Sequence, residues 1–179
     1  MTDSIRRRYE RYLPAKLSWH WDTISDSPFL WRDVSVEDVG PNMDARFEAI
    51  ADRMMKGNYY PPDAIRFYGP WMDEGRDLRQ GDRILQRARV GLFLKLWAMT
   101  EVQIAEKTDT TCTIGYLTTK RHFGRGKWQS KLTKDKGRLI LAVEATTTPG
   151  SLLFWIGLPI ARALQRRAWR RAAEEFRKL

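Results

Sequence analysis

The chain has 179 residues, of which 42% are apolar and 30% charged, and its formal net charge is +10. A domain of this length buries about 70% of its unfolded surface, and the apolar content excludes a disordered polycation. The single cysteine, Cys112, excludes an internal disulfide and a four-cysteine zinc site, as in a reducing cytoplasm. The longest apolar run, residues 152–161, covers about half of a bilayer, and the first residues lack the apolar core of a secretory signal. We therefore expect a cytoplasmic protein.

The first 18 residues are expected to form a basic arm that is mobile or loosely docked. The arm shows little apolar periodicity, and its cations are Arg6, Arg7, Arg8, Arg11 and Lys16. Residues 19–179 are expected to form a single domain. Its first strand is predicted around residues 29–36.

A helix is expected over residues 43–56, with Asn42 as its N-cap and Asp44 in its first turn. Its buried face is indicated by apolar residues at helical spacing, namely Phe47, Ile50, Ala51 and Met54. The next stretch, residues 58–81, is rich in glycine, proline and aromatic residues, with a short helical piece expected after Pro62. Its aromatic side chains are predicted to lie in the core or at the rim of a pocket.

From residue 82 the apolar period becomes two, which is typical of half-buried strands. Strands are predicted over residues 84–90 and 92–104, the second long and strongly curved, with a hairpin turn at 107–110. A strand over 111–120 follows, then a glycine-containing loop over 120–126. A returning strand over 127–133 and a last strand over 139–145 complete a run of antiparallel strands.

A long C-terminal helix is expected after Pro149, with Pro159 near its first turns. Its apolar stripe includes the small residues Ala161, Ala168 and Ala172. Such residues indicate either close packing or a cavity between helix and sheet. The predicted fold is α+β, a curved antiparallel sheet wrapped around the long C-terminal helix, with the shorter helix closing one end.

The second half of the chain resembles the DUF1990 (UPF0548) family, which shows a particular order of short motifs. The counterparts here are Gly115, Tyr116, Leu117, Thr118, His122, Gly126, Thr147, Thr148, Pro149, Gly157, Leu158, Pro159 and Gln165. Earlier counterparts in the same order are Phe47, Ala51, Pro70, Trp71, Gly75, Gly81 and Asp82. The resemblance covers roughly residues 30–175. It implies a helix-grip (START-like, Bet v 1-like) fold with a cavity between sheet and helix.

The sequence departs from the family at one turn. Relatives show Gly-Glu-Glu there, whereas this chain has Gly126, Lys127 and Trp128, so the charge at the turn is reversed. Because the family is uncharacterised, the resemblance implies no catalytic residue, and we expect no cofactor and no metal.

Few side chains have the setting of a catalytic or metal-binding group. His122 lies between cations with no carboxylate close in sequence, so a hydrogen bond that orders its loop is favoured over general-base chemistry. His20 lies between two tryptophans and is expected to pack or stack, and Cys112 is expected to be a small buried residue. Glu144 would anchor a polar ligand group if its strand face lines the cavity, or be solvated if that face points outward.

The leading prediction is a non-enzymatic protein that binds a small apolar or amphipathic molecule between the sheet and the C-terminal helix. The predicted lining residues are Trp97, Tyr116, Glu144 and Leu164. A helix-grip enzyme is an alternative, and it requires a second interior titratable group beside Glu144.

Two basic segments leave a further alternative open. Residues 116–138 carry eight lysines and arginines against Asp135, and residues 160–179 carry seven against two glutamates, whereas the rest of the chain is slightly acidic. This pattern allows a peripheral binder of nucleic acid or of an anionic membrane. The predicted anion-binding residues are Lys120, Arg121, Arg125, Lys127, Arg166 and Arg170. The sequence indicates no oligomeric state.

Overall fold

The fold is described from a computed structural model over residues 1–22, 30–90, 94–149 and 152–179. Two expected strand positions, Phe29 and Leu92, lie outside these ranges. The elements in chain order are α1 (Asp3–Tyr12), β1 (Trp31–Pro41), α2 (Asp44–Met55), β2 (Ile65–Tyr68), α3 (Pro70–Glu74), β3 (Arg83–Val90), β4 (Leu94–Lys107), β5 (Thr111–Thr118), β6 (Gly124–Asp135), β7 (Arg138–Pro149) and α4 (Leu152–Arg177).

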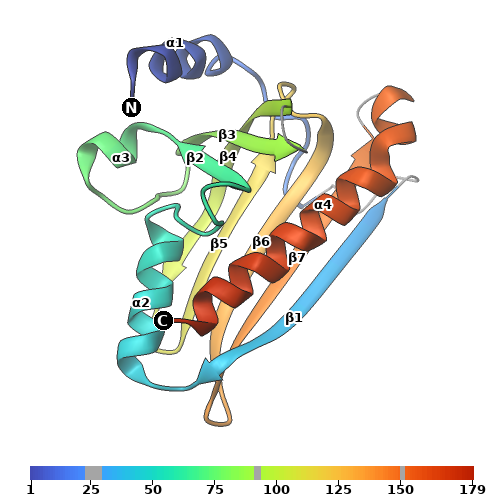
Figure 1. Ribbon diagram of the computed structural model, residues 1–179. Coiled ribbons are helices and arrows are strands. Elements are labelled where there is room, and N and C mark those ends of the chain that lie inside the picture. Colours follow the sequence, from blue (N-terminus) through green and yellow to red (C-terminus); the bar gives the residue numbers. More distant parts are fainter. Residues whose placement is uncertain (23–29, 91–93, 150–151) are drawn as a thin grey trace.

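The seven strands form one antiparallel sheet in the order β1-β7-β6-β5-β4-β3-β2. The helix α4 lies across one face of this sheet, and α2 closes one end (Figure 1). The predicted α+β architecture, a curved antiparallel sheet with a long C-terminal helix, is therefore confirmed. We call the face covered by α4 the inner face and the opposite one the outer face.

Strand alternation assigns side chains to these two faces because directly opposed cross-strand residues share a face. On β7 the inner side chains are Leu139, Leu141, Val143 and Ala145, all at most 3% exposed. They continue across β6 and β5 through register pairs such as Leu141 with Leu132 and Leu132 with Cys112. The predicted strands 127–133 and 139–145 are thus longer in the structure, since pairing continues from Gly124 with Pro149 to Asp135 with Arg138.

The C-terminal half of α4 packs tightly on the inner face. Its side chains Ala168, Trp169, Ala172, Ala173 and Phe176 are at most 5% exposed. The small residues at 168 and 172 therefore let the helix approach the sheet closely, and they leave no room for a cavity beside them.

Arginines fasten α4 to the edge strand β1. Arg162 donates two hydrogen bonds to the Asp33 carboxylate, at 2.7 and 2.6 Å, and Arg166 donates a third at 3.1 Å. Further along the helix, Arg177 donates to Glu37 at 2.7 Å. Arginines of the basic helix thus form ion pairs that hold the helix to the edge of the sheet.

The helix α2 confirms the prediction over residues 43–56, but its N-cap was assigned wrongly. The cap is Met43, which makes no side-chain capping bond. Asn42 instead extends the strand region, because its N–H donates to the carbonyl of Gly137 in the turn between β6 and β7, at 2.9 Å.

The aromatic stretch also differs from expectation. A turn follows Pro62 where a helical piece was expected, and the chain then forms β2, which pairs with β3. The short helix α3 begins at Pro70 and buries Trp71, whose indole N–H donates to the carbonyl of Lys56 at 3.3 Å. The expectation of core aromatic residues is confirmed for Tyr59, Tyr60, Phe67, Tyr68 and Trp71, which are at most 7% exposed.

The N-terminal residues form a helix on the outer face, where a loosely docked arm was expected. Helix α1 buries Tyr9, 7% exposed, against Tyr68, Leu85 and Met99. After the helix, the backbone pairs with the end of β5 through the bridge between Leu17 and Thr119. The proposed boundary at residue 18 stays a prediction.

None of the helices within the described ranges is long and apolar enough to cross a membrane.

Candidate functional site

A cluster of aromatic side chains occupies the centre of the inner face. Tyr116 on β5 stacks on Trp128 on β6, with ring centroids 4.9 Å apart and planes 17° from parallel. Phe67 meets Tyr116 edge-on at 6.1 Å and Tyr60 edge-on at 5.8 Å, and the Tyr60 ring is tilted against Trp128. Tyr116 is only half-buried, whereas its neighbours Tyr60, Phe67 and Trp128 are at most 6% exposed. Tyr116 is thus the accessible member of an otherwise buried aromatic cluster.

Polar groups surround these rings. Gln86 donates its amide N–H to Thr100 Oγ1 at 3.1 Å, and the Ser130 hydroxyl donates to the Tyr59 hydroxyl at 3.1 Å. Burial raises the pKa of Tyr116 above its ordinary value of 10, so its hydroxyl is neutral at physiological pH. The inner face therefore offers neutral hydrogen-bonding groups among apolar rings.

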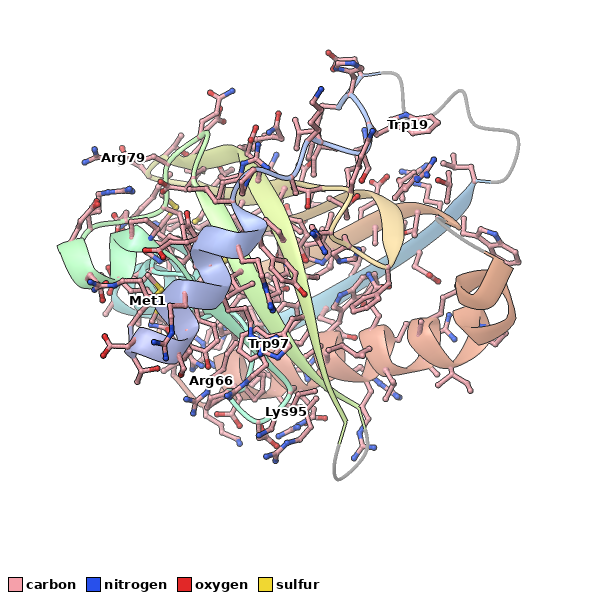
Figure 2. All side chains as sticks on the ribbon, turned by 90° about the horizontal axis from the view of Figure 1, so that it is seen from above. Met1, Trp19, Arg66, Arg79, Lys95 and Trp97 are labelled. Atoms are coloured by element: carbon pink, nitrogen blue, oxygen red, sulfur yellow. The ribbon has the colours of Figure 1, made fainter. Side chains whose placement is uncertain are left out.

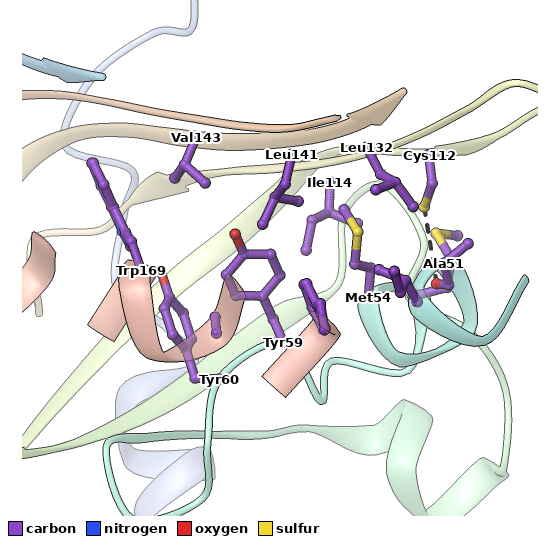
Figure 3. Close-up of a cluster of buried hydrophobic side chains, with 14 of the residues drawn as sticks. Ala51, Met54, Tyr59, Tyr60, Cys112, Ile114, Leu132, Leu141, Val143 and Trp169 are labelled. Atoms are coloured by element: carbon purple, nitrogen blue, oxygen red, sulfur yellow. Dashed lines mark hydrogen bonds between the residues drawn. The ribbon is translucent and has the colours of Figure 1, made fainter. Parts of the chain in front are cut away.

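Two indole N–H groups in this cluster have no hydrogen-bond partner. Within the described residues, Nε1 of Trp128 and Nε1 of Trp169 are buried and unpaired. Figure 3 shows Trp169 beside Tyr60, across from Val143 of the sheet. A buried unpaired donor costs about 1–3 kcal/mol. Because the Tyr60 side chain already interacts with Trp169, the Trp128 N–H is the position where an acceptor atom would be stabilised most.

The space between helix and sheet differs along the length of α4. Around Trp169 and Phe176 it is filled, because Tyr59 packs edge-on against Phe176 at 5.4 Å. Leu164, one turn before Ala168, lies on the same sheet-facing stripe and is half-buried. A cavity along the whole helix is thus excluded, and Tyr116 and Leu164 are two half-buried side chains of the inner face and of the sheet-facing stripe of α4.

Two of the predicted lining residues lie on the outer face. Trp97 packs beside α1, with the Arg8 guanidinium 4.5 Å from its ring centroid. Glu144 pairs with Arg32 of β1, with Nε and Oε1 2.9 Å apart. The prediction that Trp97 and Glu144 line the inner face was therefore wrong. Side chains alternate along a strand, and the immediate neighbours of both residues point to the inner face.

The predicted anion-binding residues do not form one surface feature. Lys127 is held by the N-terminal segment, since its Nζ donates to the carbonyl of Trp21 at 3.3 Å. Arg121 lies over the Tyr12 ring at 5.5 Å, and Arg166 is paired with Asp33. The other three are exposed, namely Lys120, Arg125 and Arg170. Their binding of an anion stays a prediction.

The structure supports the non-catalytic interpretation of the two reactive side chains. Nδ1 of His122 lies 2.9 Å from the carbonyl oxygen of Gly124 and 3.2 Å from its backbone nitrogen, and this contact orders the loop before β6. Burial lowers the pKa of His122 from 6.5 to about 4. Cys112 is fully buried, which raises its thiol pKa to about 12. In the described part of the chain, no three histidine, cysteine or acidic side chains gather as a metal site would require.

Comparison with known proteins places this architecture in a family. The model of a domain of unknown function, DUF1990, matches residues 22–175. The chain belongs to the DUF1990 family. No curated protein matches this DUF1990 chain.

Several solved structures share the fold at low identity. A hypothetical protein from Helicobacter pylori is 11% identical, with a TM-score of 0.56 over 88% of this chain and 93% of its own. An uncharacterized protein from Rhizobium leguminosarum is 11% identical, with a TM-score of 0.52 over 83% of this chain and 95% of its own.

A third similar structure belongs to a biosynthetic pathway. The di-domain ARO/CYC protein StfQ from the steffimycin biosynthetic pathway is 11% identical, with a TM-score of 0.57 over 99% of this chain and 59% of its own. At these identities the likeness extends to the fold alone. Together with the sheet and α4, it establishes the helix-grip architecture for this DUF1990 protein.

Proposed function

We propose that this DUF1990 protein binds a small, largely apolar molecule that carries a hydrogen-bond acceptor. The binding place is the inner face around Tyr116, between β5, β6 and the sheet-facing stripe of α4 near Leu164. The observation that carries the proposal is the buried, unpaired indole N–H group of Trp128, which stacks against Tyr116.

The chemistry of the site supports a ligand of this class. Aromatic rings supply apolar contact area, and the neutral Gln86, Thr100 and Tyr116 side chains supply orientation without charge. A ligand carbonyl or ether oxygen that accepts from an indole N–H would remove the cost of leaving that donor unpaired.

Binding is favoured over catalysis at this site. A reaction that moves a proton needs at least one titratable group placed near the reacting atoms. The acidic side chains on the inner face of β1, Asp33 and Glu37, are already paired with arginines of α4. Glu144, which was the first candidate for such a group, lies on the outer face.

Native mass spectrometry tests the proposal first. We expect protein purified from its own host to carry an added mass of a few hundred daltons, which is lost on acid denaturation. Titration with the neutral fluorophore N-phenyl-1-naphthylamine then probes the site, since an uncharged probe avoids binding to surface cations.

Matched tryptophan substitutions locate the binding place. Leu164→Trp adds bulk on the sheet-facing stripe of α4, and Ile160→Trp adds the same bulk at a position that is 66% exposed. We expect Leu164→Trp to weaken fluorophore binding at least tenfold and Ile160→Trp to leave it unchanged. Equal binding by the two variants, both shown by circular dichroism to be folded, would overturn the proposal.

A third variant tests the unpaired donor itself. Trp128→Phe keeps an aromatic ring beside Tyr116 but removes one N–H. We expect the co-purifying mass to be lost or strongly reduced. If Trp128→Phe carries as much of the added mass as the unmodified protein, the indole N–H does not contribute to binding.

A further inference from the structure

A hollow of about 320 Å³ lies on the outer face, at the edge formed by β2, far in sequence from both basic segments. Figure 2 labels Arg66, Lys95 and Trp97 at this corner of the molecule, beside the N-terminal helix. The residues that line the hollow are Pro62, Asp63, Ala64, Arg66, Arg87, Arg89 and Lys95.

The register of the strands places these cations directly against one another. Arg66 on β2 is opposite Arg87 on β3, and Arg89 on β3 is opposite Lys95 on β4. Like charges in directly opposed positions destabilise a sheet. Two such pairs in succession therefore cost stability, unless an anion lies between them.

Carboxylates in the described part of the chain compensate this charge only weakly. Within the described ranges, none of the four lining cations forms an ion pair. The one acidic lining residue, Asp63, accepts a hydrogen bond from Arg171 of α4 at 2.9 Å, and this contact lowers the pKa of Asp63. The charge of Asp63 is thus balanced mainly by Arg171, which lies outside the hollow, with a weaker attraction to Arg89.

Aromatic rings hold the arginines near the hollow in place. The Arg87 guanidinium lies 5.7 Å from the ring centroid of Tyr68 and 6.0 Å from that of Trp97. Arg8 of α1 lies 4.5 Å from the same Trp97 ring. These rings hold the guanidinium groups in fixed orientations. Because the guanidinium groups cover the ring faces, a nucleobase could not stack on them.

We propose that this hollow binds a compact anion that carries two or more phosphate groups. Guanidinium groups bind phosphate oxygens through paired N–H donors, and several phosphates are needed to balance four clustered cations. The volume lies at the lower end of the range for small-molecule sites. The site is on the opposite face from Tyr116 and is independent of the function proposed above.

Isothermal titration calorimetry with sodium tripolyphosphate at low ionic strength tests the site. The variant Arg89→Gln/Lys95→Gln removes one opposed pair of cations, both of which are exposed. The control Arg79→Gln/Lys131→Gln removes the same charge from exposed positions outside the hollow. We expect at least a tenfold loss of affinity in the first variant and less than a threefold loss in the control.

A thermal unfolding scan separates lost binding from lost folding. Because the substitutions relieve opposed like charges, we expect the unfolding midpoint of Arg89→Gln/Lys95→Gln to equal or exceed that of the unmodified protein. Absence of tripolyphosphate and vesicle binding would overturn the proposal, as would equal affinity losses in the two double variants.

Vesicle sedimentation distinguishes the sources of the phosphate groups. Vesicles containing phosphatidylinositol bisphosphate are compared with phosphatidylserine vesicles of the same total charge. Sedimentation with the first vesicles alone supports a lipid headgroup as the ligand. Tripolyphosphate binding without sedimentation supports a soluble oligophosphate. Equal sedimentation with both vesicles, unchanged by Arg89→Gln/Lys95→Gln, would show attraction to the whole surface charge and overturn the site.

Discussion

Replacing Asp33 by asparagine removes the charge that fastens α4 to the edge strand β1. The carboxylate accepts two bonds from Arg162 and one from Arg166, and the Asp33 and Arg162 side chains are only 12% and 24% exposed. Hydrogen bonds to charged groups contribute about 1.5–3 kcal/mol each. Since the asparagine oxygen still accepts one bond from Arg162, and the bond from the exposed Arg166 adds little, we expect the free energy of unfolding to fall by about 1.5–3 kcal/mol.

Urea denaturation followed by far-ultraviolet circular dichroism measures this change. Asp52→Asn is the control, because its exposed pair with Lys56, the residue that caps the C-terminus of α2, contributes only about 0.2–0.5 kcal/mol. The hydrogen bond from Arg162 lowers the pKa of Asp33, so the stabilisation is present above pH 3.8 and is lost as the pH falls further. A difference between Asp33→Asn and the unmodified protein below about 0.5 kcal/mol at pH 7 would refute the fastening role.

Three further predictions concern other parts of the fold. Tyr9→Ala should lower the free energy of unfolding, measured by urea denaturation, by about 3 kcal/mol because α1 buries this ring. An unchanged free energy of unfolding would indicate a loosely docked arm. Gly126→Ala would place a methyl group 2.0 Å from the Thr146 carbonyl oxygen, so we expect the free energy of unfolding to fall by more than about 3 kcal/mol. A urea midpoint equal to that of the unmodified protein would contradict this close approach of the strands. Because the pKa of His122 is lowered from 6.5 to about 4, the free energy of unfolding should fall as the pH drops through this interval. His122→Gln should remove this pH dependence, which amounts to roughly 3 kcal/mol at most. Parallel pH profiles of the two proteins would exclude His122 as the cause.

Periodicity in the sequence predicted the sheet and both main helices because each has a sustained apolar pattern. The three missed elements lack that pattern. Strand β2 has four residues and α3 has five, which is too short for a period to be recognised. Helix α1 was missed because its apolar side chains, including Ile5, Tyr9 and Tyr12, are interrupted by four arginines.

The inner-face site was predictable only in part. Tyr116 follows from strand alternation, and the aromatic stretch before the sheet indicated Tyr60 and Phe67. The same alternation argues against Trp97 and Glu144, since each has inner-face residues as immediate neighbours. The place of Trp169 in this site was not predicted. A single tryptophan among the arginines of a helix does not indicate that its N–H is buried beside the aromatic cluster.

The outer-face hollow could not have been predicted from charge counts along the chain. Its cations come from three strands in a part of the sequence that is close to neutral overall. Arg66 and Arg87 become neighbours only through the pairing of β2 with β3. Local charge density in a folded sheet therefore depends on register, which sequence windows do not contain.

The pairing of the first strand with the last imposes an order on biosynthesis. Strand β1 ends at Pro41, and its partner β7 begins at Arg138. At ordinary translation rates, the ribosome needs on the order of 10 s to synthesise the chain between them. During that time a nascent β1 lacks its partner, and the helix that covers it is made after β7. Completion of the sheet is therefore expected to wait until β7 has been synthesised, and long-range pairing of this kind makes folding slow.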